Sequence, residues 1–102
     1  VVKEAMKAAK ETGVSNWADI KDVVKHISDN MLSDLKYIAK KKLTGEFDEY
    51  DGKIFLEDQK MVARSRLRSI AIITLKTAER ILNAIVEVFQ GAANKALGWN
   101  IF

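Results

Sequence analysis

The chain of 102 residues contains no cysteine, no proline and only five glycines. Without cysteine it cannot form disulfide bonds, thiolate nucleophiles or cysteine-ligated zinc sites. The lack of proline and the scarcity of glycine disfavour folds with many turns, such as all-β sandwiches, and suit long helices. The most apolar window, Ile70 to Phe89, carries four charged residues, so no transmembrane segment is expected.

The composition is that of an ordinary globular protein. Hydrophobic residues make up 48% of the chain and charged residues 30%, which excludes a disordered chain. The length suits one helical domain, so residues 1–102 are predicted to form a single all-α unit. A cysteine-free chain with no visible secretory signal is expected in the cytoplasm.

The longest periodic stretch runs from Asp58 to Phe89. Its apolar residues recur every three or four positions, and no glycine or proline interrupts them, so the pattern predicts one long helix. The apolar stripe is wider than a single partner helix requires. At 1.5 Å per residue the helix would measure about 48 Å, so the molecule is expected to be elongated.

The rest of the chain is predicted to cover this stripe. A short helix is expected over Val1–Thr12 and a long amphipathic helix over Trp17–Lys42, giving an antiparallel helical hairpin with Asp58–Phe89. Between them, Asp51-Gly52 is the strongest short hairpin signal in the chain, so a small β-hairpin is predicted at residues 46–57.

The excess of apolar surface on the long helix predicts self-association. Burying one large aliphatic side chain is worth about 1.5–3 kcal/mol, so several of them left in water would be costly. A two-fold dimer that forms a four-helix bundle would cover them. The residues expected at this contact are Leu67, Ile70, Leu75, Ile81, Leu82, Ile85 and Phe89.

The net charge of +3 is mild, but charges of one sign occur in blocks. If the two long helices fold back on each other, two basic blocks meet at one end, and DNA or RNA binding becomes an alternative function. The intervening acids, six between Gly45 and Asp58, lie close enough to cancel much of this field. The residues of this alternative are Lys36, Lys40, Lys41, Lys42, Lys60, Arg64, Arg66 and Arg68.

No motif supports a metal site, a cofactor or catalysis. Aligning Gly52 with the invariant glycine of a calcium-binding EF-hand places Phe47 at the first ligand position, where an oxygen is needed. The single histidine, His26, has Val23 three residues before it, where helical di-metal sites carry glutamate. Contact with Asp22, four residues earlier, is the simpler interpretation of this histidine.

The sequence therefore predicts a non-catalytic helical-bundle module that acts by protein–protein association. The simplest such association is a homodimer, and the alternative is association with a helix of a different protein. Arg64 falls on the apolar side of the long helix, so either the core contact begins only at Leu67, or Arg64 pairs with a carboxylate of the preceding loop.

Overall fold

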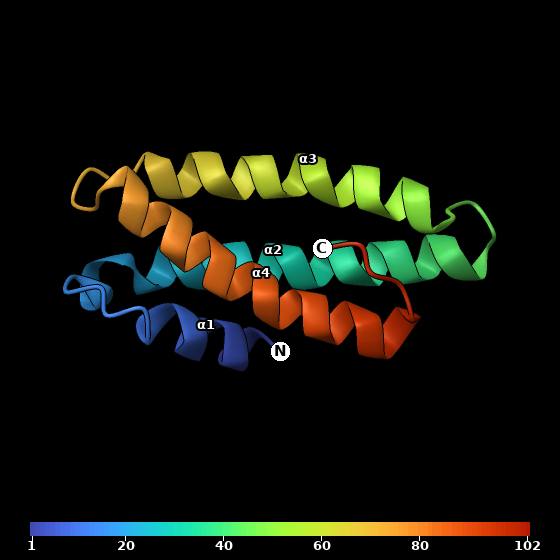
Figure 1. Cartoon of the computed structure of the whole chain (residues 1–102), viewed down its shortest axis with the longest axis horizontal. Coiled ribbons are helices and arrows are strands. Elements are labelled where there is room, and N and C mark those ends of the chain that lie inside the picture. Colours follow the sequence, from blue (N-terminus) through green and yellow to red (C-terminus); the bar gives the residue numbers. More distant parts are fainter.

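The computed structural model describes residues 1–102 and consists of four helices without a single strand. They are α1 (Val2–Lys10), α2 (Trp17–Leu43), α3 (Glu49–Arg68) and α4 (Leu75–Leu97) (Figure 1). The all-α, helical-bundle prediction is confirmed. None of the four helices combines the length and the apolar composition that a membrane crossing requires.

The helices α2 and α4 form the centre of the bundle. Both α1 and α3 pack against this pair, and they make no contact with each other, because α3 lies on one side of it and α1 on the other (Figure 1). The molecule measures 43 × 21 × 18 Å, which confirms the predicted elongation. One side of α3 therefore faces the bundle and the opposite side faces solvent.

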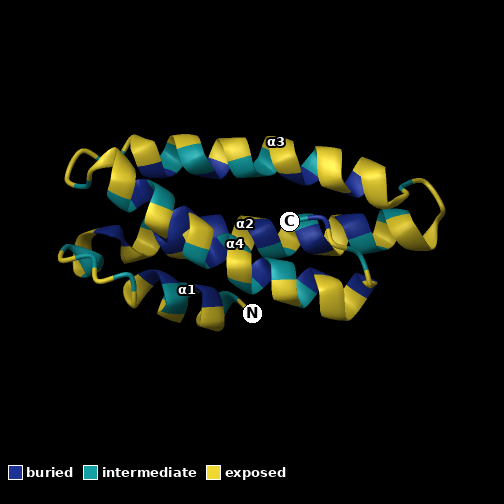
Figure 2. Cartoon of the chain, viewed as in Figure 1, coloured by how far each residue is buried: buried dark blue, intermediate teal, exposed yellow.

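The buried side chains form two clusters along the long axis (Figure 2). The larger cluster joins α1, the first part of α2, the end of α3 and most of α4, and includes Ile20, Ile81 and Phe89. The smaller cluster lies at the other end of the bundle and includes Ile38 and Leu56. Since the apolar stripes of all four helices converge on these clusters, the chain builds its core without a second copy.

The β-hairpin predicted at residues 46–57 does not form, because α3 already begins at Glu49. The Asp48 side chain accepts a hydrogen bond from the Asp51 backbone N–H, and the Asp51 side chain accepts one from the Asp48 N–H. This capping box satisfies two backbone donors that a helix start otherwise leaves without partners. Asp51-Gly52, interpreted from the sequence as a hairpin turn, therefore belongs to the first turn of α3.

The long helix predicted from Asp58 to Phe89 is also wrong, because the chain breaks between Arg68 and Leu75. The Ser69 hydroxyl donates a hydrogen bond to the Arg66 carbonyl at the end of α3. Thr74 then adopts an extended backbone, and its hydroxyl accepts a hydrogen bond from the Thr77 N–H. Such an N-cap starts a new helix, so the stripe is divided between α3 and α4.

The last four residues fold back along the bundle. Ile101 is completely buried in the smaller cluster, and the Phe102 ring lies 6.1 Å from that of Phe89. The Trp99 ring covers Gly52, where a side chain larger than hydrogen would meet the indole within van der Waals distance. The tail thus closes the end of the bundle that α1 does not reach.

Candidate protein-binding surface on α3

The solvent-facing side of α3 carries large apolar side chains. Tyr50, Ile54 and Met61 are 62%, 50% and 61% exposed, and their helical positions fall within about 40 degrees of one another. The buried residues of α3, among them Leu56 and Leu67, occupy the opposite side. Figure 2 shows exposed residues along the outer side of α3 over its whole length.

These residues belong to a regular pattern. At alternating steps of four and three, the outer side of α3 presents Tyr50, Ile54, Glu57, Met61, Arg64 and Arg68, which we call the outer stripe. The average step is 3.6 residues, the period of the α-helix itself, so these side chains stay on one side of α3 along its whole length. An ordinary solvated helix side has no need of three large apolar residues.

Charge is distributed unevenly along α3. Its first half, Glu49–Asp58, carries four acids and one lysine, whereas its second half, Gln59–Arg68, carries four cations and no acid. The helix therefore has an acidic first half and a basic second half. This order also suits the helix dipole, because acids are favoured at the start of a helix and cations at its end.

The basic half of α3 is fastened to α4 by one carboxylate. Glu79 accepts hydrogen bonds from Arg64 Nε at 2.8 Å and from Arg68 Nη2 at 3.0 Å. The hydrogen bond from Arg64 holds the pKa of Glu79 below its usual range. The expected partner of Arg64, a carboxylate of the preceding loop, is therefore corrected to a carboxylate of α4.

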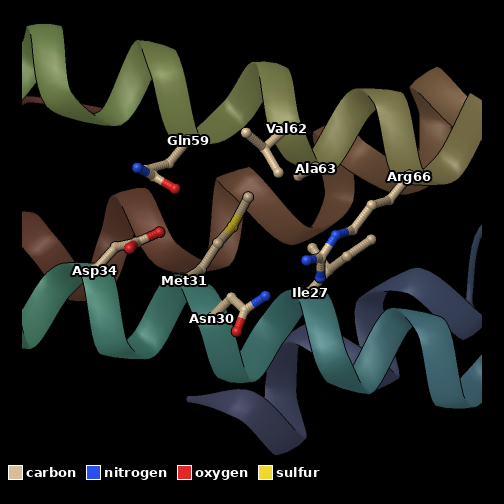
Figure 3. A pocket seen from close by; sticks show the side chains of 8 residues that line it. All are labelled: Ile27, Asn30, Met31, Asp34, Gln59, Val62, Ala63 and Arg66. Atoms are coloured by element: carbon tan, nitrogen blue, oxygen red, sulfur yellow. The ribbon is translucent and has the colours of Figure 1, made fainter.

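A small polar cavity lies between α2 and α3. Figure 3 shows Asp34 and Asn30 of α2 and Gln59 and Arg66 of α3 around it, together with the apolar side chains Ile27, Met31, Val62 and Ala63. Its volume is about 20 Å³. That is room for one water molecule, whereas small-molecule sites typically need about 300–1,000 Å³. The cavity is too small to be a substrate site.

Two groups at this cavity are poorly satisfied. Burial raises the pKa of the Asp34 carboxyl, and no cation counteracts the shift. Arg66 Nη1 is buried and has no hydrogen-bond partner in the protein. Buried polar groups without partners cost stability, so the contact between α2 and α3 is weaker here than at the two apolar clusters.

The residues predicted for self-association are divided by the fold. Leu67, Ile81, Leu82, Ile85 and Phe89 are buried in the larger cluster of the single chain, so they present no surface to a second copy in this conformation. Ile70 is half-buried, and Leu75 is 61% exposed at the start of α4. Self-association stays a prediction, and the outer stripe of α3 is one exposed surface available for it.

The eight cations of the nucleic-acid alternative do not gather in one place. Four lie in the last turns of α2, whereas Lys60 already lies about 16 Å along α3 from its start, and the other three follow it. Several have partners within the chain: Lys41 binds Glu46, Lys60 binds Glu57, and Arg64 and Arg68 share Glu79. Nucleic-acid binding stays a prediction of the sequence, with no common surface behind it.

His26 is exposed on α2, in a shallow open depression that also includes Asp22, Arg66 and Ser69. Asp29, another acid near it in the sequence, accepts a hydrogen bond from Lys25. No group of three histidine, cysteine or acidic side chains that could hold a metal ion occurs in the structure. The Ser69 hydroxyl in this depression donates its hydrogen bond to the Arg66 carbonyl and makes none to His26.

Sequence reasoning missed Tyr50, Ile54 and Met61 because it assigned residues 46–57 to a hairpin. The signal that could have found them is Asp48 followed three residues later by Asp51, which starts a helix whose outer side then carries all three. No family model, curated protein or solved structure matches this chain, so the function must be argued from its own residues.

Proposed function

We propose that this protein is a non-catalytic helical module that acts by binding another protein through the outer stripe of α3. The observation that carries the proposal is the row of Tyr50, Ile54 and Met61, each at least half exposed on one side of one helix. Aromatic residues, methionine and arginine are the types most enriched in protein interfaces. Large apolar residues exposed together on one side of a helix mark an interaction site.

The design of the bundle supports this role. Because α1, α2, α4 and the C-terminal tail bury the main apolar clusters, α3 can present its outer side without exposing the core. The mixed character of the stripe, apolar in part and charged in part, is that of a reversible contact, since permanent interfaces are more uniformly hydrophobic. A groove occupied by a helix is an established way in which proteins recognise one another.

A photo-reactive amino acid at position 61 tests the proposal. Placed at Met61 in the native cell, it should cross-link to a protein, whereas the same amino acid at Lys36, an exposed position on α2, should not. Ile54→Lys should abolish the adduct formed from position 61, because it puts a charge into the apolar part of the contact. Adducts that form equally from positions 61 and 36, or none from either, would refute the proposed function.

A further inference from the structure

We propose that a second copy of this chain occupies the outer stripe of α3, with the two α3 helices pairing antiparallel about a two-fold axis. The inference rests on the proposed function and names its partner. The argument starts from charge: the first half of α3 is acidic and the second half is basic. Antiparallel pairing places each acidic half against the basic half of the other copy, whereas parallel pairing places like charges together.

The outer stripe is also complementary to the outer stripe of a second copy that runs in the opposite direction. Full overlap of the two helices pairs Tyr50 with the partner's Arg68, Ile54 with the partner's Arg64 and Glu57 with the partner's Met61. A guanidinium over a tyrosine ring is a favourable cation–π contact, and the aliphatic stem of an arginine covers an isoleucine well. Every apolar residue of the stripe thereby meets a long flexible side chain instead of water.

The orientations of Arg64 and Arg68 are already fixed within each copy. Glu79 binds both guanidinium groups, and the pair of arginines exceeds its single negative charge. Residual positive charge is therefore held at the end of the stripe where the partner's acidic half would lie. Side chains positioned before binding lose less conformational entropy when the contact forms.

The contact between two α3 helices is small. A helix of 20 residues is about 30 Å long, and one pair of such helices buries less than the roughly 1,200 Å² typical of stable complexes. We therefore expect a weak, reversible dimer that forms at high protein concentration. Its affinity should fall as salt is added, because the charged halves are exposed to solvent.

The natural absence of cysteine makes the register directly testable. Glu57→Cys and Met61→Cys are prepared as two separate proteins and oxidised mildly, alone and mixed in equal amounts. The proposed register places position 57 of one copy opposite position 61 of the other, so the mixture should yield about tenfold more disulfide-linked dimer than either variant alone. Lys36→Cys and Lys40→Cys, which have the same spacing on α2, are the matched control and should give only background.

Sedimentation equilibrium of the unmodified chain completes the test. Dimerisation that weakens with salt and is lost in Ile54→Lys, which places a second cation opposite the partner's Arg64, supports the inference, provided that circular dichroism shows the variant to be folded. Self-linking of Met61→Cys that equals the yield of the mixture would overturn the antiparallel register. A chain that is still monomeric at about 1 mM would refute the proposal that a second copy occupies the outer stripe.

The two proposals fail in different ways. If the purified chain stays monomeric while position 61 cross-links to a different protein in the cell, the self-pairing inference falls and the proposed function stands. If position 61 yields no adduct and the purified chain is monomeric, both fall.

Discussion

At the scale of single residues, the two arginines of α3 nearest its centre behave as opposites. Arg64 donates to Glu79 across the contact with α4, whereas Arg66 has a buried nitrogen with no acceptor. The first side chain makes a charge-assisted hydrogen bond between helices, and the second loses the water that would otherwise solvate it. The two arginines therefore have opposite effects on stability: Arg64 stabilises the folded protein and Arg66 destabilises it.

We predict that Arg64→Met lowers the melting temperature, because it removes the stronger of the two hydrogen bonds to Glu79. Arg66→Met should leave the free energy of unfolding unchanged or raise it by about 1 kcal/mol, since it removes a buried donor without a partner. Thermal unfolding followed by circular dichroism compares the two variants. A larger loss of stability in Arg66→Met than in Arg64→Met would contradict this account.

Asp34 gives the folded protein a predictable dependence on pH. Burial raises its pKa above the ordinary value of 3.8, so the protonated form is favoured in the folded state. Its contribution to stability is therefore fully present below that value and is lost as the pH rises through the folded-state pKa. At neutral pH the ionised carboxylate destabilises the contact between α2 and α3.

Asp34→Asn should accordingly raise the melting temperature at pH 7 and leave it nearly unchanged at pH 3. Asp29→Asn on the same helix is the control and should not stabilise at either pH, because Asp29 is exposed and already accepts a hydrogen bond from Lys25. Melting curves at both pH values measure the difference. An equal gain at pH 3 and pH 7 would rule out ionisation as the cause.

At the scale of elements, two helices carry a glycine that their backbones do not need. Gly91 lies inside α4 with open space around it, and a methyl group at Gly52 in α3 would sit 3.5 Å from Ile38 and Trp99, an ordinary contact distance. Gly98, in contrast, ends α4 in the left-handed region at a φ of 70 degrees. Alanine fits the first two positions and is strained at the third.

Gly91→Ala and Gly52→Ala should each raise the free energy of unfolding by about 0.5–1 kcal/mol, because alanine has the higher helix propensity. Gly98→Ala should lower it by about 1 kcal/mol. Urea titration of the three variants measures these changes. Destabilisation by Gly91→Ala would show that the helix is not continuous through that position.

The sequence predicted elements well where polar caps and apolar period agree. The helix expected over Trp17–Lys42 is observed at Trp17–Leu43, because its stripe is regular and Thr44 and Gly45 follow it. The prediction from the sequence was wrong where a continuous apolar pattern masked a helix cap. Ile70, Ala71, Ile72 and Ile73 continue the apolar pattern across a loop, so only the cap at Thr74 reveals the break.

The proposed binding surface could not be predicted from the sequence, because it depends on where α3 begins. With Asp51-Gly52 interpreted as a turn, Tyr50 and Ile54 belonged to a different element from Met61. Once the capping box at Asp48 starts the helix, all three share one side. Which side of α3 stays exposed to solvent then depends on how the four helices pack. The pattern of a single sequence does not contain that information.

At the scale of the whole molecule, the smaller of the two core clusters depends on the C-terminal tail. Ile101 is 1% exposed and packs with residues of α2, α3 and α4, while Trp99 lies over α3 and receives the Lys42 ammonium group on its ring. Phe47, in the connection between α2 and α3, also packs against this cluster. The tail is therefore a structural part of the core.

Deletion of residues 99–102 should lower the free energy of unfolding by about 3–5 kcal/mol, as expected for large buried side chains. Hydrogen exchange should accelerate at Ile38 and Leu56, in the smaller cluster, more than at Ile20 and Ile81, in the larger one. Asn100→Ala, which removes only an exposed hydrogen bond from Gln90, is the control and should have little effect. Uniform acceleration in both clusters would mean that the bundle unfolds as a single unit.

The placement of α1 against α4 has a consequence for the order of folding. With nine residues, α1 is too short to persist as a helix in water by itself, and one of the two helices that hold it is the last in the chain. Its contact with α4 joins elements far apart in the sequence, and closing so long a loop is entropically costly, so we expect this contact to form after the central pair. The segment nearest the N-terminus is thus expected to become ordered late.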